Sequence, residues 1–372
     1  MYSFKMFLVL AIFLISSSNC ENFDYPIGGY ERADPINPQL IFPCLAPIYD
    51  PEYGRFDPVI YVDFKVTLPP IAGCPEIVNK KTVRFFAISK KNPTVITSVS
   101  NIEPGSKVSI YLHGFNEEYD FLNGLTVALS TLRTNDWVVL VDWARLANSR
   151  AVGNVRIPYI NIFLSGVNTI LVGRITCKFV KFLNKNHGIR IEDILIVGHS
   201  EGATTTGFIA SYCREKYGIL FQHITTTELP SIPFRNSNYP LANRTSAKYF
   251  EAIFTTKSSN IPVIDEITSA IAHLGYFEVD AHCVYYVNPE LLLAEQPPCV
   301  ILPGPTFCSH DFAQQVFISA YSGRCLYRYG PCPEIILPPS NQEYGLTRLN
   351  CPDHPSLGRT CIRTTSFPVK SC

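Results

Sequence analysis

The chain has 372 residues, of which 47% are hydrophobic and 17% are charged, a composition typical of a globular protein and not of a disordered one. Lysine and arginine together number 31, as do aspartate and glutamate, so the formal net charge is zero. Proteins that neutralise many phosphates carry a basic surplus, so nucleic acid is not an expected partner. The 13 cysteines and 29 prolines indicate disulfides and rigid turns.

Residues 1–20 have the layout of a signal peptide. Lys5 is the only charge, Met6–Ile15 is an unbroken apolar run, and small polar residues follow it up to Cys20. The run is shorter than the roughly 20 residues that span a bilayer, and a buried N-terminal helix is the alternative interpretation. No later stretch is identified as a membrane span. We therefore expect a secreted, extracellular protein.

Cleavage after Cys20 leaves an even number of cysteines, which in an oxidising compartment indicates up to about six disulfides of undetermined connectivity. Asn243 begins a glycosylation sequon, so a glycoprotein is expected. Residues 21–75 are rich in proline, tyrosine and aspartate and are predicted to form an irregular N-terminal extension, in which Cys44 and Cys74 are candidates for a disulfide. Residues 76–372 are predicted to form the main domain, which ends in a cysteine-rich tail.

Within the main domain, buried apolar strands alternate with helical patterns. The predicted strands are Val108–Leu112, Trp137–Val141, Ile194–Val197 and His223–Thr227, and the predicted helices are Tyr159–Leu183 and Thr204–Tyr217. Uninterrupted apolar strands that alternate with helices are typical of a mostly parallel sheet covered on both faces. The sequence therefore predicts an α/β fold.

One motif stands between a predicted strand and a predicted helix. Gly198, Ser200 and Gly202 form a Gly-x-Ser-x-Gly pattern there. A serine on such a tight turn has an exposed hydroxyl, the glycines allow strand and helix to approach closely, and the helix N-terminus favours a developing negative charge. The motif predicts a nucleophilic serine, and the alternative is an ordinary turn with a capping serine.

A nucleophilic serine needs a base and an acid that orients the base. On an α/β-hydrolase sheet the acid and then the histidine follow the serine in the chain. Several histidines do so, and the residues alone do not choose among them: His223, His273, His282, His310 and His354.

From about Val83 to Pro368 the chain resembles the secreted pancreatic-lipase-like family, which includes insect phospholipase A1 and yolk-protein-like members. Separate blocks carry the resemblance in the family's order: Arg84–Pro93, Tyr111–Phe115, Val141–Trp143, Gly198–Ala203, Leu274–Asn288, Gln296–Cys299, Cys308–His310 and Gly358–Thr364. The resemblance implies an α/β-hydrolase fold with a mostly parallel central sheet, stabilised by disulfides. The tail after His310 is too short for the family's C-terminal β-sandwich domain, so no colipase partner is expected.

The resemblance also implies a role for individual residues. Ser200 is the expected nucleophile and His310 the expected general base. The backbone N–H groups of Phe115 and Glu201 are expected to form the oxyanion hole, and Glu228 falls at the position of the acid. His113, His199, Asp142 and His282 are expected to be structural.

The chain departs from the family pattern at several of these positions. Glu228 stands where the family has an aspartate, and Glu201 stands where the family has an apolar residue. The segment that aligns with the family's calcium loop, Leu241–Ser246, has no carboxylate, so no metal and no cofactor are expected. Thr255 and Thr256 lie where the family has another acid. If Cys299 pairs with Cys308, the lid between them is the short loop Val300–Phe307, which resembles phospholipase A1 more than a triglyceride lipase.

The resemblance therefore implies a secreted carboxylic-ester hydrolase, of the lipase or phospholipase A1 type, that acts on lipid esters at a membrane or lipoprotein surface. The alternative is a lipase-like protein with weak or no turnover that binds lipid or a protein partner. Ser200 and His310 favour the enzyme, whereas Glu201, Glu228 and the altered calcium segment favour the binding protein. The geometry distinguishes the two: the enzyme requires His310 within hydrogen-bond reach of both Ser200 and Glu228, and a Glu228 directed to solvent would favour the binding protein.

Overall fold

The structure is a computed structural model. It describes residues 46–61, 71–115, 117, 122–147, 158–230, 234, 239, 241–256, 279–288, 296, 305–321, 327–331, 345–347 and 358–363. The expected signal peptide, His273, His354, and the cysteines at 44 and 299 lie outside these residues.

The fold is built on one central sheet of 11 strands. In chain order its strands are β5 (Arg84–Ser89), β6 (Asn92–Thr97), β7 (Val108–Leu112), β8 (Trp137–Asp142), β9 (Ile194–His199), β10 (Phe221–Thr227), β11 (Ala247–Phe254), β12 (Cys283–Val287), β13 (Tyr327–Pro331), β14 (Gly345–Thr347) and β15 (Gly358–Arg363). Their order across the sheet is β14-β13-β15-β12-β11-β10-β9-β7-β8-β5-β6. Strands from β8 to β15 pair in parallel, and the strands outside them pair antiparallel.

The four predicted strands are confirmed as β7, β8, β9 and β10. Their apolar side chains suit strands that are covered on both faces of the sheet. Every residue of β7, β8 and β9 is buried. The parallel register pairs Leu112 of β7 with Gly198 of β9, and Thr227 of β10 with His199 of β9. The parallel strands therefore end together, and the loops that follow them share one edge of the sheet.

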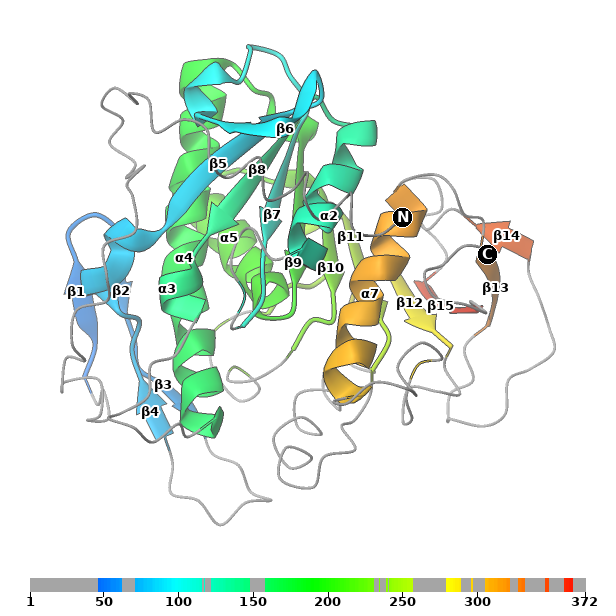
Figure 1. The fold of residues 1–372 in the computed structure, drawn as a ribbon. Coiled ribbons are helices and arrows are strands. Elements are labelled where there is room, and N and C mark those ends of the chain that lie inside the picture. Colours follow the sequence, from blue (N-terminus) through cyan, green and yellow to red (C-terminus); the bar gives the residue numbers. More distant parts are fainter. Residues whose placement is uncertain are drawn as a thin grey trace.

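Helices cover both faces of this sheet (Figure 1). They are α2 (Leu122–Ser130), α3 (Ala144–Ala147), α4 (Pro158–His187), α5 (Glu201–Tyr217) and α7 (Pro305–Tyr321), with short 3-10 helices at Ile77–Thr82, Val99–Asn101, Thr131–Arg133 and Ile191–Asp193. The core on one face includes α4 and α5, and the core on the other includes α2 and α7. The helix predicted from Thr204 begins earlier, at Glu201, directly after the motif serine.

Part of the stretch expected to be irregular forms two small antiparallel hairpins. They pair β1 (Ile48–Asp50) with β2 (Gly54–Phe56) and β3 (Val59–Tyr61) with β4 (Ile71–Gly73). Asp50 closes the first turn by accepting hydrogen bonds from the backbone N–H groups of Glu52 and Tyr53 and from the Lys80 ammonium at 2.6 Å. Burial opposes ionisation of Asp50, but these hydrogen bonds outweigh it and lower the pKa of the carboxyl.

A disulfide joins the two helices on one face of the sheet. Cys177 of α4 and Cys213 of α5 are bonded, across a sequence separation of 36 residues. Cys74, Cys283 and Cys308 are also disulfide-bonded. The candidate partners of Cys74 and Cys308 fall outside the described residues, so those two pairings stay predictions.

Helix α4 is long and apolar, and it lies in the core of the fold. Its segment Phe163–His187 is long and apolar enough to cross a membrane, and it is the one described helix that passes this test. However, 83% of the most apolar 18-residue window of this segment is buried inside the fold. Helix α4 packs along α5 there. These features are those of a core helix.

Candidate active site

The proposed nucleophile lies on a sharp turn between β9 and α5. Ser200 has φ 53° and ψ −123°, a backbone conformation that residues with a side chain seldom adopt. Its N–H donates to the carbonyl of Thr227 at 2.9 Å, and its carbonyl accepts from Ala203 N at 2.8 Å inside the first turn of the helix. The chain is therefore held on both sides of Ser200, which is half-buried.

The two motif glycines are required by close backbone packing. A Cβ on Gly202 would lie 2.2 Å from the carbonyl oxygen of Leu112, and one on Gly198 would lie 2.4 Å from the carbonyl oxygen of Gly202. Both contacts are with main-chain atoms, which cannot rotate away as a side chain can. The spacing of the motif thus follows from the approach of α5 to the ends of β7 and β9.

Backbone strain marks the shared edge of the sheet. Among the described residues, the non-glycine residues with positive φ are Ser200, Glu228 and Asn288. Each one directly follows a parallel strand, β9, β10 or β12. Such conformations cost about 1–3 kcal/mol each and concentrate at functional sites. Two of the three are residues to which the sequence assigns a catalytic role.

The proposed acid and base are in contact. Glu228 is 5% exposed, and its Oε2 lies 3.3 Å from Nδ1 of His310 on α7. Glu228 is therefore turned toward His310 and not toward solvent. Burial lowers the pKa of His310, but the hydrogen bond to Glu228 and its charge outweigh burial, so the pKa of the imidazole is raised.

Two threonines that follow β11 hold the Glu228 carboxylate. Its Oε1 accepts from the backbone N–H of Thr255, from that of Thr256 at 3.1 Å, and from the Thr255 hydroxyl at 2.8 Å. Its Oε2 accepts from the Thr256 hydroxyl. An aspartate at position 256, as in the family, would place a second negative charge against Glu228. Thr256 instead offers Glu228 a hydroxyl donor at this position.

A buried glutamine, to which the sequence pattern gives no role, forms hydrogen bonds next to the Glu228 carboxylate and His310. Gln296 donates from Nε2 to the carbonyl of Thr255 at 2.8 Å, and its backbone N–H donates to the Ser309 hydroxyl at 3.0 Å. Its Oε1 accepts from Asn288, the third residue with positive φ. Gln296 thus connects the threonines that hold Glu228 to the residue before His310. Its place just before the proline pair is the sequence signal that could have indicated this role.

The turn expected to supply half of the oxyanion hole lies against the serine. A Cβ on Gly114 would be 2.9 Å from the Cβ of Ser200, so only glycine fits next to Phe115 in this turn. His113 fixes the turn, because its Nε2 accepts from Trp143 N at 3.1 Å and its Nδ1 lies 3.0 Å from the Gly114 carbonyl. Both nitrogens are used by the backbone, which agrees with the structural role expected for His113.

Glu201, the other residue assigned to the oxyanion hole, has its N–H in the first turn of α5, where backbone donors lack intrahelical acceptors. Its side chain is 4% exposed and contacts the Ser165 hydroxyl of α4. Burial raises the pKa of this carboxyl well above its usual range; the contact with Ser165 lowers it, and the nearby Glu117 raises it further. The Ser165 hydroxyl, which has one proton, also lies 3.1 Å from the carbonyl of Ala147. Both contacts are satisfied together when Glu201 is protonated and neutral.

The serine and the histidine belong to neighbouring elements but are not directly bonded. Among the described residues no hydrogen bond joins Ser200 to His310. The ring of His199, which precedes the serine, lies 4.8 Å from the His310 ring. Catalytic hydrogen bonds are often long in a ligand-free enzyme and shorten when substrate binds.

Asp142 and His282, which are also expected to be structural, contact backbone groups. Asp142 pairs with Arg84 and accepts from Ala144 N at 3.1 Å, which fixes the turn after β8. His282 exchanges hydrogen bonds with the backbone of Phe250. The segment aligned with the family's calcium loop is a turn in which the Asn243 Oδ1 accepts from the N–H and the hydroxyl of Thr245.

The sheet order, the crossover helices and the strained serine turn define an α/β-hydrolase fold, as expected. No family model matches the chain. The chain is similar to Phospholipase A1 2 of Vespa affinis, with 25% identity over 300 residues that cover 77% of this chain and 81% of the wasp protein. It is also similar to Phospholipase A1 VesT1.02 of Vespa tropica, with 26% identity over 223 residues that cover 59% of this chain and 67% of the relative.

These sequence similarities support the resemblance to a lipase-like family. Among solved structures, a ferulic acid esterase from Anaeromyces mucronatus covers 81% of this chain and 96% of its own, with 13% identity and a TM-score of 0.35. A lipase/esterase from Lactobacillus plantarum covers 64% of this chain and 91% of its own, with 12% identity and a TM-score of 0.33.

Proposed function

We propose that this protein is a secreted serine hydrolase that cleaves carboxylic esters of lipids, of the phospholipase A1 type, through Ser200, His310 and Glu228. The observation that carries the proposal is the buried contact between Glu228 and His310 at the edge of the sheet where the strained Ser200 turn also lies. Positioned acid, base and nucleophile at one strand edge are the parts that acyl transfer requires.

In the proposed reaction, Ser200 Oγ attacks the ester carbonyl carbon while His310 Nε2 takes the hydroxyl proton. The carbonyl oxygen becomes an oxyanion that accepts hydrogen bonds from the backbone N–H groups of Phe115 and Glu201. His310 then gives the proton to the alcohol oxygen as the ester bond breaks. Water, deprotonated by His310, then attacks the acyl carbonyl carbon, and His310 returns this proton to Ser200 Oγ as the acyl–serine bond breaks and the fatty acid leaves.

Glu228 orients His310 and stabilises its charged form. A carboxylate held by the Thr255 and Thr256 donors cannot rotate away, so it fixes the proton of His310 on Nδ1 and leaves Nε2 free to accept. The raised pKa of His310 has the direction that this partnership requires. The longer side chain of a glutamate serves here because Glu228 has φ 54°, which changes the direction in which its side chain leaves the strand end.

Glu201 is compatible with this reaction. A negative charge beside the oxyanion would oppose catalysis, but its carboxyl is buried against Ser165 and its raised pKa favours the neutral form. The Glu201 side chain is therefore no obstacle to turnover, and the contact of Glu228 with His310 supports the enzyme.

Phospholipid is the substrate class that we infer, because the wasp relatives are named phospholipase A1 and because the expected lid is short. The signal-peptide pattern of residues 1–20 and the disulfides support secretion. No colipase is part of the proposal.

The test is covalent labelling of the secreted, disulfide-intact protein with a fluorophosphonate, followed by fatty-acid release from phosphatidylcholine and triglyceride. Labelling is expected for the wild type and for the exposed-carboxylate control Glu192→Gln, and it is expected to be absent in Ser200→Ala. Release from the outer ester of phosphatidylcholine should exceed release from triglyceride. A folded wild-type protein that takes no label would overturn the proposal and favour lipid binding without turnover.

A further inference from the structure

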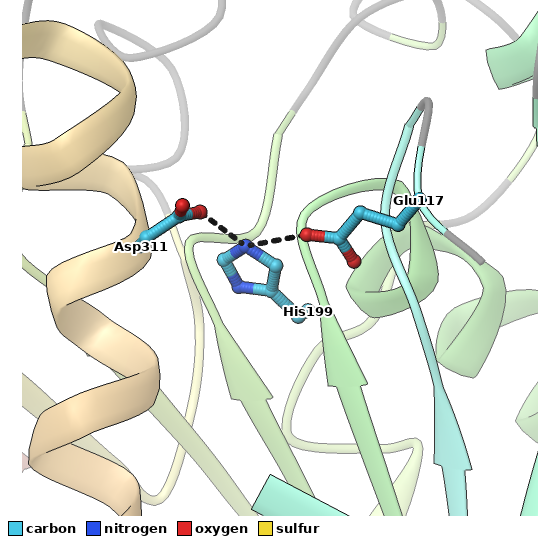
Figure 2. Close-up of side chains that lie close together, drawn as sticks. All are labelled: Glu117, His199 and Asp311. Atoms are coloured by element: carbon cyan, nitrogen blue, oxygen red, sulfur yellow. Dashed lines mark ion pairs between the residues drawn. The ribbon is translucent and has the colours of Figure 1, made fainter. Parts of the chain in front are cut away.

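A second cluster of polar side chains lies beside the proposed catalytic groups and has no part in the reaction described above. It consists of Glu117 in the turn after β7, His199 at the end of β9, and Asp311 on α7 (Figure 2). The His199 Nε2 lies 3.6 Å from Asp311 Oδ1 and 3.9 Å from Glu117 Oε1. One ligand atom from each residue lies within 4.8 Å of the others.

The histidine nitrogen in this cluster is buried and lacks a hydrogen-bond partner. The His199 side chain is 1% exposed, and its Nε2 is one of the buried atoms in the described part of the chain that make no hydrogen bond. A buried polar atom without a partner is unfavourable, so native proteins seldom leave one. Figure 2 shows this nitrogen directed between the two carboxylates.

The other nitrogen of the ring is already engaged. His199 Nδ1 lies 2.9 Å from the Thr227 hydroxyl, and that hydroxyl can donate in turn to the carbonyl of Gly198 at 3.5 Å. When the Thr227 hydroxyl donates to Gly198, Nδ1 carries the ring proton and Nε2 presents a lone pair to the two carboxylates. A histidine ligand of a metal has this arrangement, in which an outer partner fixes the tautomer.

Glu117 is held in the same manner. Its Oε2 accepts from the backbone N–H of Gly114 at 2.6 Å, which leaves Oε1 facing His199. Asp311 has a side chain that is 32% exposed and borders solvent, so it leaves a route of entry to the cluster. One imidazole nitrogen and two carboxylate oxygens therefore point toward one another. Thr227 holds the His199 ring, and the Gly114 N–H holds the Glu117 carboxylate.

We infer that Glu117, His199 and Asp311 bind a divalent transition cation, of which Zn²⁺ is the reference case. Zn²⁺ binds imidazole nitrogen and carboxylate oxygen at about 2.0–2.2 Å, so two ligands at a tetrahedral angle stand about 3.4 Å apart. The separations of 3.6 and 3.9 Å from His199 Nε2 need a small contraction, and the three ligand atoms together span up to 4.8 Å, so one carboxylate must move closer on binding. The nitrogen ligand disfavours Ca²⁺ and Mg²⁺, which prefer all-oxygen sites.

The cation would join α7 to the ends of β7 and β9, which already pair in the central sheet. Glu117 belongs to the turn that contains Gly114, His199 precedes Ser200, and Asp311 follows His310 in the chain. A bound cation would thus link α7 to the end of β9 through Asp311 and His199. This inference goes beyond the proposed hydrolysis, and its test does not use activity.

The experiment uses the full secreted protein after treatment with a chelator, with Zn²⁺ added in equilibrium dialysis and bound metal measured by atomic absorption. We expect one Zn²⁺ per chain with a Kd of about 1 µM or below. Asp311→Asn should weaken binding by more than the roughly 10–100-fold that loss of an outer partner causes. The matched control is Asp280→Asn, an exposed carboxylate on another part of the surface that should bind as the wild type does.

A second readout guards against a folding defect. In chelator, Asp311→Asn should melt at the wild-type temperature, and Zn²⁺ should raise the melting temperature of the wild type and of Asp280→Asn only. Absence of Zn²⁺ binding would overturn the inference and leave His199 as a histidine that shares a proton with two carboxylates. Equal binding by Asp311→Asn and the control, or equal affinity for Ca²⁺, would overturn it as well.

Discussion

Replacement of Glu228 by glutamine tests the central contact of the proposed site. The carbonyl oxygen of glutamine can keep the donors that reach Oε1, while its amide nitrogen takes the place of Oε2 opposite His310. The amide then donates to Nδ1 and moves the imidazole proton to Nε2. In that tautomer His310 cannot accept the proton of Ser200.

The expected loss follows from this change of tautomer. A neutral amide in place of the orienting carboxylate lowers kcat by about 10³–10⁴-fold, which corresponds to about 4–5.5 kcal/mol of transition-state stabilisation. KM should change little, because the Glu228 side chain is buried behind His310 and does not contact the substrate. Glu228→Asp retracts the carboxylate by about 1.5 Å, one bond length, and should lose less, about 10–100-fold.

The assay is steady-state hydrolysis of a soluble short-chain ester, so that no lipid surface complicates kcat, together with the rate of fluorophosphonate labelling. Glu192→Gln is the matched control, because its carboxylate is exposed and pairs only at the surface. A loss below about tenfold in folded Glu228→Gln, beside complete loss in Ser200→Ala, would refute the role given to Glu228.

Three further predictions concern stability. Replacing Cys177 and Cys213 together by alanine should lower the free energy of unfolding by about 4 kcal/mol for a loop of 36 residues, and unchanged urea unfolding would contradict this. Gly202→Ala should destabilise the fold by about 2–3 kcal/mol or prevent secretion, because its Cβ meets main-chain oxygen; a wild-type melting temperature would be evidence against that packing. The lowered pKa of Asp50 gives stability that is present above about pH 4 and is lost as pH falls through the folded pKa. Asp50→Asn should therefore have a free energy of unfolding about 1–3 kcal/mol lower than the wild type at pH 7, and this free energy should fall less on acidification. If urea unfolding gives parallel pH curves for the two proteins, this assignment is wrong.

The elements that could be predicted from sequence are those that depend on residues close together in the chain. An apolar run such as Ile194–Val197 has one compatible place in a covered parallel sheet, and the Gly-x-Ser-x-Gly spacing is dictated by contacts between a strand and the helix that follows it directly. The assignment of His310 instead needed the family resemblance, because nothing local separates it from the other histidines.

The residues that were missed act across the sheet. The sequence pattern gives Thr255 and Thr256 only as positions that lack an acid, yet they contact Glu228 from just after β11, 27 and 28 residues further along the chain. Their role depends on the register of β10 with β11, in which Thr227 pairs with Ile253. The direction of the Glu201 side chain depends likewise on α4, and the four short strands before residue 76 depend on packing against the domain.

The turns that close α4 and α5 lie at the opposite end of the parallel strands from Ser200. Each helix is followed by a glycine in the left-handed region, Gly188 and Gly218, and no described atom lies within 4 Å of a Cβ built on either. The strands that follow, β9 and β10, then run the length of the sheet to the site. A peptide tag inserted at either turn is therefore a suitable attachment point for oriented immobilisation, with the reactive edge facing away from the support.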